Sequence, residues 1–146
     1  MTFTSNSPDD TKTIGFRLGK LLGPGSVVGL YGELGSGKTI FVKGIARAFG
    51  IHESEIMSAS FTIIAEYNSV PRFNHIDLYR IERESELEEL GLWDYLGNDA
   101  VSVIEWAEKV DHALPDDTVR VRFRSWGDNK REIIVEGKNG KNWNNL

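Results

Sequence analysis

The sequence predicts a three-layer α/β fold, in which a mixed central sheet is flanked by helices on both faces. A short apolar strand, a glycine-rich loop and an amphipathic helix follow one another between Ser26 and Phe49. Two further apolar strands end in acidic residues, one at Asp77 and one at Glu105. Near the end of the chain, two short strands in succession predict a C-terminal antiparallel hairpin.

The first half of the chain is predicted to begin with a helix. Ser7 can cap this helix, Pro8 suits its first position, and two acids follow in its positively polarised first turn. Apolar residues at helical spacing continue to Leu22, and the glycine–proline break at residues 23–25 ends the helix. A buried strand over residues 26–31 and a helix over residues 40–49 then enclose the glycine-rich loop.

The second half alternates strands with short helices. A hairpin is expected from strands at residues 61–67 and 72–78, with Pro71 at its turn. Ser85 opens a capping-box pattern for a short helix that ends at Gly91. The remaining predicted elements are a strand over residues 101–105, a short helical piece to about residue 110, a strand over residues 119–124 and its partner over residues 132–136.

Composition limits the class of protein. The 146 residues fit one domain, residues 1–146, and the 40% hydrophobic and 27% charged contents are ordinary for a globular protein. The absence of cysteine excludes disulfides and thiolate metal sites. No apolar run approaches membrane-spanning length, and the first residues lack the features of a signal peptide. We therefore expect a cytoplasmic protein with no membrane association and a frayed tail over residues 137–146.

The charge distribution argues against a protein that binds nucleic acid unaided. The net charge is −5, and acids predominate between Asp77 and Asp116. The last part of the chain is mildly basic, and one face of its first strand is entirely arginine, formed by Arg120, Arg122 and Arg124. This face would contact either tRNA or an acidic partner, although solvated helix and strand faces explain the same pattern equally well.

Residues 32–39 match the phosphate-binding loop pattern G-x-x-x-x-G-K-[ST] at every fixed position. Glycines allow successive backbone N–H groups to turn inward and form an anion site. Lys38 can reach the terminal phosphates, and the Thr39 hydroxyl can bind magnesium. The strand before the loop and the helix after it are the context that the motif requires. The predicted nucleotide-binding residues are Glu33, Leu34, Gly35, Ser36, Gly37, Lys38, Thr39 and Ile40.

Acids at two strand ends are the candidate metal ligands. Asp77 ends one predicted strand, and Glu105 ends another. Acids at the carboxyl ends of strands project into the crevice where a phosphate loop holds its ligand. We therefore predict that at least one of them lies in the coordination sphere of a magnesium ion.

Four segments, in order along the chain, resemble the TsaE family, which is also called YjeE. They are residues 30–39, residues 58–62, the His-Ile-Asp-Leu-Tyr-Arg segment 75–80, and the Ile-Glu-Trp segment 104–106. The resemblance covers about residues 30–108 and extends more loosely to the ends. It implies a P-loop NTPase-like fold, binding of ATP and Mg²⁺, and slow hydrolysis by the chain alone. It further implies action with the TsaD–TsaB complex in forming N6-threonylcarbamoyladenosine at position 37 of tRNA, with tRNA reached through these partners.

The resemblance also implies roles for individual residues. Lys38 would neutralise the charge that develops on the transferred phosphoryl group. Thr39, Asp77 and Glu105 would share the magnesium ion and its waters, and Glu105 would also orient the attacking water. Which acid binds the metal directly stays open. Packing explains His75, Tyr79, Arg80 and Trp106 as well as a functional role does.

The chain departs from the family pattern at one segment. The family usually has Ser-Pro-Thr-[Phe/Tyr]-Thr where this chain has Ser58-Ala59-Ser60-Phe61-Thr62. Ser60 retains a hydroxyl, but Ala59 lacks the fixed φ angle of proline. We therefore expect a looser segment here than in the family.

Three other functions are alternatives to the ATPase activity that the resemblance implies. A GTPase would need Asn-Lys-x-Asp to recognise guanine, and the nearest match, residues 129–132, has glutamate in place of aspartate. A small kinase would need an arginine-bearing lid, and no arginine-rich insertion stands between the predicted elements. A module that binds ATP without hydrolysing it uses the same loop, so it stays an alternative.

Overall fold

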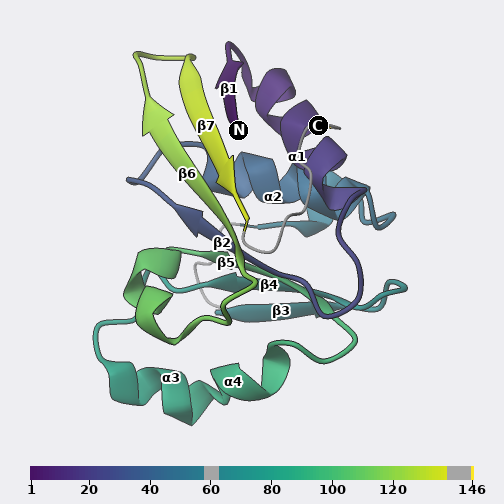
Figure 1. Ribbon diagram of the computed structural model, residues 1–146, viewed down its shortest axis with the longest axis vertical. Helices are drawn as coiled ribbons and strands as arrows, with labels where there is room; N and C mark the ends of the chain where they lie inside the picture. The colour runs from purple at the N-terminus through teal and green to yellow at the C-terminus, as the bar shows by residue number, and fades with distance from the viewer. Residues whose placement is uncertain (58–62, 138–145) are drawn as a thin grey trace.

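A mixed seven-stranded sheet forms the centre of the protein (Figure 1). The computed structural model describes residues 1–57, 63–137 and 146. The strand order across the sheet is β1-β7-β6-β2-β5-β4-β3. The strands are β1 Thr2–Ser5, β2 Val27–Tyr31, β3 Ile64–Tyr67, β4 Phe73–Asp77, β5 Val101–Glu105, β6 Val119–Ser125 and β7 Arg131–Glu136.

The parallel or antiparallel pairing of the strands determines where the glycine-rich loop lies. Strand β2 pairs in parallel with β5 and β6, and β5 pairs in parallel with β4. Strands β3, β7 and β1 add antiparallel pairs at the two sides. The carboxyl ends of the parallel strands therefore share one edge, and the glycine-rich loop follows β2 at that edge. The predicted mixed sheet and C-terminal antiparallel hairpin are confirmed.

Helices cover both faces of the sheet, as predicted. Helices α1 (Pro8–Gly19) and α2 (Lys38–Arg47) pack against each other on one face. The other face is covered by α3 (Glu84–Leu90), α4 (Leu92–Tyr95) and the short 3-10 helices η2 (Ala107–Lys109) and η3 (Asp111–Ala113). A further 3-10 helix, η1 (Glu53–Glu55), follows α2. Figure 1 shows α1 and α2 on one side of the sheet and α3 and α4 on the other.

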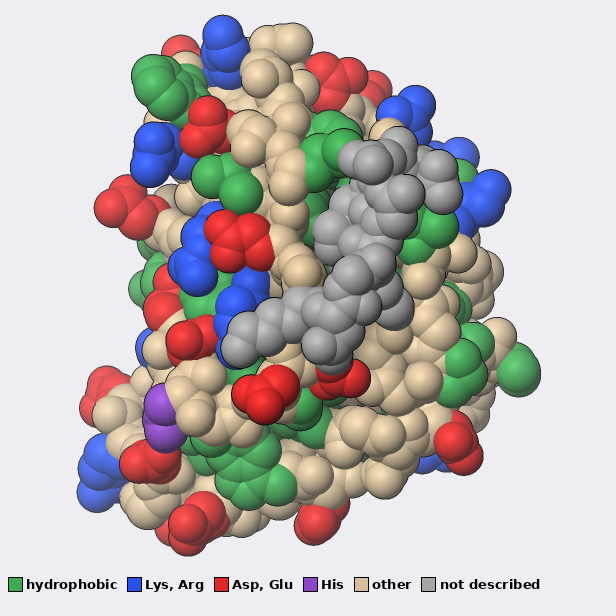
Figure 2. Space-filling model, in the orientation of Figure 1, with side chains coloured by type: hydrophobic (Ala, Val, Ile, Leu, Met, Phe, Trp, Pro, Cys, Tyr) green, Lys and Arg blue, Asp and Glu red, His purple; other side chains and the backbone are tan. Residues whose placement is uncertain are grey.

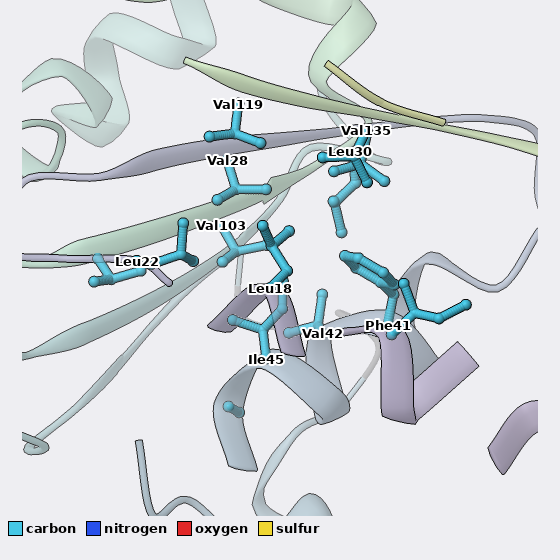
Figure 3. Packing of buried hydrophobic residues seen from close by; sticks show 14 of the residues in the cluster. Leu18, Leu22, Val28, Leu30, Phe41, Val42, Ile45, Val103, Val119 and Val135 are labelled. Carbon is cyan, nitrogen blue, oxygen red and sulfur yellow. The ribbon is translucent and has the colours of Figure 1, made fainter. Parts of the chain in front are cut away.

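The larger hydrophobic core lies between the sheet and the pair α1 and α2. Figure 3 shows Leu18, Phe41, Val42 and Ile45 from these helices directed toward Leu30 and several valines of the strands. The two helices approach closely because Gly44 has no side chain: a Cβ there would overlap the backbone of Lys12. Glycine at this crossing therefore fixes the position of α2, and with it the loop that precedes α2.

The boundaries of two predicted helices differ from those in the structure. Helix α3 begins one residue before Ser85 and has Arg83 as its N-cap, without a side-chain cap, so the predicted capping box does not form. Gly91 ends α3 in the left-handed conformation, as predicted. Helix α1 ends at Gly19, before the Gly-Pro-Gly break, and leaves Leu21 exposed.

Strand β1 was not predicted. It has only four residues, and its pairing with β7 joins parts of the chain more than 120 residues apart. Short strands that depend on such distant partners leave little local signal. The predicted strand residues Phe61 and Thr62, the segment 58–62 as a whole and most of the predicted frayed tail lie outside the described residues.

Candidate nucleotide site

The phosphate-loop motif forms the turn between β2 and α2. Gly35 and Gly37 have φ angles of 77° and 102°, a backbone region that side chains rarely adopt. Gly37 is also the N-cap of α2, and no side chain caps this helix. The first N–H groups of a helix have no intrahelical partner, so those of α2 are available to an anion. The glycines therefore adopt the backbone conformation that the motif predicts for a phosphate-binding loop.

Lys38 lies against its own loop. Its Nζ donates hydrogen bonds to the carbonyl oxygens of Gly32 and Glu33, the second at 2.9 Å. The residue is 5% exposed, and burial lowers the pKa of its amine, while the nearby carboxylate of Glu108 acts in the opposite direction. A buried cation placed here is a strong attractor for phosphate oxygens.

Hydrogen bonds through the buried residues Glu105 and His75 connect α2 to two strands. The Thr39 hydroxyl donates to Oε1 of Glu105 at 2.8 Å, and Nε2 of His75 donates to Oε2 of Glu105 at 2.6 Å. Side chains of His75 and Glu105 are each 3% exposed. Both carboxylate oxygens of Glu105 are thus fixed in direction. His75, which the sequence left ambiguous, orients the acid beside the loop.

The two predicted acids lie side by side. Asp77 and Glu105 are directly paired in the parallel register of β4 and β5, and both are buried. Oδ1 of Asp77 accepts a hydrogen bond from the backbone N–H of Tyr79 at 3.0 Å. The structure therefore brings together Thr39, Asp77 and Glu105, as the strand-end argument predicts.

This set of oxygen donors fits a magnesium ion. Hydroxyl and carboxylate oxygens are its preferred protein ligands, and Mg²⁺ usually takes one or two carboxylates and fills its other positions with phosphate and water. In the described part of the chain, no group of three or more His, Asp or Glu side chains forms a protein-only metal cage. The donor set suits a metal that arrives with a nucleotide.

Two aromatic side chains, Trp106 and Tyr79, extend the site beyond Lys38. Trp106, directly after Glu105, is held at φ 62°, and its ring centre lies 3.9 Å from Nζ of Lys38. The ring of Tyr79 packs on Trp106 with centres 5.3 Å apart. Lys109 donates to the carbonyls of Tyr79 and Ile81, both at 2.7 Å. Trp106 therefore contacts the loop lysine as well as neighbouring the acid.

The phosphate loop, the two acids, Tyr79 and Trp106 border a cavity of about 410 Å³ at the carboxyl edge of the sheet. Sequence reasoning found much of its lining but missed the residues that come from distant elements. The cavity is lined by Pro8, Thr11, Leu34, Gly35, Ser36, Gly37, Lys38, Thr39, Ile40, Asp77, Tyr79, Arg80, Glu105, Trp106, Asn129 and Arg131. Arg131 had appeared only in a rejected guanine-recognition pattern, and no local signal marks Pro8 or Thr11 as site residues.

A larger cavity of about 1070 Å³ lies away from this chemistry. The turn between β3 and β4, together with the segment from Leu90 to Ala100, supplies most of its lining. It contains no residue of the phosphate loop and neither Asp77 nor Glu105. We assign the candidate site to the smaller cavity, because the charged groups and the helix N-terminus converge there.

Each of the three arginines on the outer face of β6 has an acidic neighbour. Nε of Arg120 lies 3.0 Å from Asp111, Nε of Arg122 lies 3.9 Å from Glu136, and Nη1 of Arg124 lies 3.8 Å from Glu132. The face is therefore a row of ion pairs, which weakens its attraction for a polyanion. Figure 2 shows acidic side chains over the end of the molecule formed by α3 and α4.

A phosphate loop at the carboxyl end of a central parallel strand, facing two strand-end acids, defines a P-loop NTPase-like protein. The family model for "Threonylcarbamoyl adenosine biosynthesis protein TsaE" matches residues 5–133. The chain belongs to the TsaE family.

Individual relatives agree with the family match. The tRNA threonylcarbamoyladenosine biosynthesis protein TsaE of Treponema pallidum is 42% identical over 135 residues, covering 92% of this chain and 99% of that protein. The Bacillus subtilis protein of the same name is 41% identical over 128 residues, covering 87% and 79%. The crystal structure of Bacillus subtilis YdiB superposes with a TM-score of 0.76 and 33% identity, covering 94% of this chain and 84% of that one.

Among the described residues, no helix is long and apolar enough to cross a membrane.

Proposed function

We propose that this protein is a Mg²⁺-dependent ATPase that serves the formation of N6-threonylcarbamoyladenosine in tRNA. The chemistry of the site supports the ATPase, and membership of the TsaE family supports the biological role. The observation that carries the proposal is the hydrogen bond from Thr39 to Glu105 beside the phosphate loop. Thr39 and Lys38 are the first two residues of α2, so the hydroxyl, the carboxylate and the lysine all line the same cavity at this helix N-terminus.

In this proposal, the loop residues bind the phosphates. Backbone N–H groups between Gly35 and Ile40 cradle the β- and γ-phosphates, and Lys38 neutralises charge on the transferred phosphoryl group. The amine of Lys38 already lies at the loop, where it donates to the carbonyl oxygens of Gly32 and Glu33. Burial of the lysine strengthens its attraction for phosphate by lowering the local dielectric constant.

Thr39, Glu105 and Asp77 would hold the magnesium ion and its waters. A bound magnesium ion would supply positive charge that offsets the negative charge of the phosphates. The carboxylate of Glu105 accepts from Thr39 and from His75, so its direction is fixed before the nucleotide arrives. Glu105 is the group that we assign to orient the attacking water, with Asp77 beside it.

The protein would act through TsaD and TsaB and reach tRNA through that complex. A net charge of −5 opposes independent binding to a polyanion. The ion pairs on the outer face of β6 leave that face little free positive charge. The resemblance to the TsaE family implies weak hydrolysis by the chain alone, and we propose that the partners make it faster.

The test is phosphate release from ATP, measured with and without Mg²⁺ and with and without TsaD–TsaB. We expect slow, Mg²⁺-dependent release by the chain alone and faster release with the partners. Tight ATP binding with no release under any condition would favour a non-hydrolysing module. Transfer of the γ-phosphate to a small acceptor would favour a kinase.

A further inference from the structure

Arg131 joins two loops that are far apart in the sequence. It is the first residue of β7, and its guanidinium lies between the phosphate loop and the turn between β6 and β7. Nε donates to the carbonyl oxygen of Ser36 at 3.1 Å, and Nη2 donates to that of Gly35 at 3.2 Å. On the other side, Nη1 donates to the carbonyls of Gly127 at 3.3 Å and Lys130 at 3.2 Å.

These bonds hold two backbone carbonyls in the glycine-rich part of the phosphate loop. The two carbonyls belong to Gly35 and to Ser36, which lies between Gly35 and Gly37. Both glycines have positive φ angles, and glycine backbone rotates more freely than that of other residues because it has no Cβ. In a trans peptide, the carbonyl and the following N–H lie in one plane and point in opposite directions. Holding the carbonyls of Gly35 and Ser36 therefore sets the directions of the N–H groups of Ser36 and Gly37.

One other contact within the loop acts on the first of these two peptides, and in the described part of the chain only Arg131 is seen to hold the carbonyl of the second, Ser36–Gly37. The N–H of Ser36 donates to the carbonyl of Glu33 at 3.1 Å, within the loop itself. The outward carbonyls of Gly35 and Ser36 are held by the fork of a single side chain from another element. A phosphate site works best when its donors are already aimed at the ligand, because ordering them on binding costs free energy.

We propose that Arg131 is a positioning residue, a clasp that holds the phosphate loop in its anion-binding shape by fixing the Gly35 and Ser36 carbonyls. The proposal rests on the nucleotide-binding function proposed above. It requires the fork of the guanidinium, with two donors at a set angle, as well as its charge. Lysine keeps the charge but offers one point-like ammonium, so it cannot hold both carbonyls in the same geometry.

The experiment compares Arg131→Lys and Arg131→Met with the wild type. Arg124→Lys and Arg124→Met are the matched controls, because Arg124 lies on the adjacent strand and its side chain is exposed. Thermal unfolding establishes that each variant folds. Hydrogen exchange of the amides between Gly35 and Lys38 is measured without nucleotide, and the affinities for ADP and for adenosine are measured with a metal chelator present.

We expect both Arg131 variants to exchange loop amides faster and to bind ADP about tenfold more weakly, with adenosine affinity within about twofold of wild type. The Arg124 variants should match the wild type in all three measurements. If the Arg131→Lys variant binds ADP and exchanges its loop amides as the wild type does, the clasp proposal is overturned and only a role for the charge remains. Equal losses for ADP and adenosine would also overturn it. If the wild type itself fails to bind ADP, the proposed function fails, while the exchange measurement still tests the clasp.

Discussion

Replacing Glu105 by glutamine separates its charge from its shape. The side chain is buried and accepts from Thr39 at 2.8 Å and from His75 at 2.6 Å. Glutamine keeps the size but loses the charge, and its NH₂ group replaces one of the two acceptor oxygens. Hydrogen bonds to a charged group contribute about 1.5–3 kcal/mol, so we expect Glu105→Gln to lose about 2 kcal/mol of unfolding free energy.

The effect on hydrolysis should exceed the effect on folding. Removing the carboxylate takes away a magnesium ligand and the group that orients water, so phosphate release should fall tenfold or more, a barrier increase of about 1.4 kcal/mol or above. Asp77→Ala and Glu105→Ala should each show a loss of at least the same size, while both proteins remain folded. ADP affinity in a chelator should stay within about threefold of wild type, because the phosphate loop is unchanged.

The assay is Mg²⁺-dependent phosphate release at saturating ATP, with thermal unfolding monitored on the same samples. Glu88→Gln, an exposed acid on α3, is the control and should behave as the wild type does. If the Glu105 and Asp77 variants hydrolyse ATP at the wild-type rate, the argument from strand-end acids is wrong. If they lose ADP affinity in the chelator as strongly as they lose hydrolysis, the acids shape the loop and do not act on the metal.

Four further predictions follow from the same structure. Lys38→Ala should abolish Mg²⁺-dependent phosphate release, and unchanged turnover would refute the loop assignment. Nucleotide should change tryptophan emission through Trp106, whose ring contacts Lys38, and a signal that survives Trp106→Phe intact would place the reporter elsewhere. Gly44→Ala should destabilise the protein by about 3 kcal/mol in urea unfolding, since a Cβ would overlap the backbone of α1; a loss under about 1 kcal/mol would contradict the close crossing. Burial and the hydrogen bond to Asp111 raise the pKa of Tyr31 to about 12, above its ordinary value of about 10. The protonated phenol therefore stabilises the fold fully below about pH 10. The difference in unfolding free energy between wild type and Tyr31→Phe should be constant there and should shrink between about pH 10 and 12. A difference that does not change with pH would contradict this.

The sequence predicted the site where its signals are local. The glycines of the loop motif permit its tight turn, and its flanking strand and helix are short-range patterns. Asp77 and Glu105 were found because parallel strands bring their carboxyl ends to one edge, a rule that needs no knowledge of packing. These predictions rested on backbone geometry that a few neighbouring residues determine.

The remaining features depend on contacts between distant parts of the chain. Arg131 bonds to Ser36 across 95 positions, and only the pairing of β6 with β7 brings it there. The same holds for His75, whose bond to Glu105 follows from the register of β4 against β5. The backbone at Trp106 adopts a left-handed conformation that aromatic residues rarely take, and tertiary packing has to hold it. Patterns along the sequence carry no signal for such contacts.

Reconstitution of the tRNA modification tests the central claim most directly. The measurement is repeated turnover of tRNA to threonylcarbamoyladenosine by TsaD, TsaB and threonylcarbamoyl-adenylate, with and without this protein and ATP. We predict that sustained turnover requires both the protein and hydrolysable ATP, and that Lys38→Ala does not support it. Turnover that proceeds equally well without the protein would contradict the proposed function, even if the ATPase site is correct.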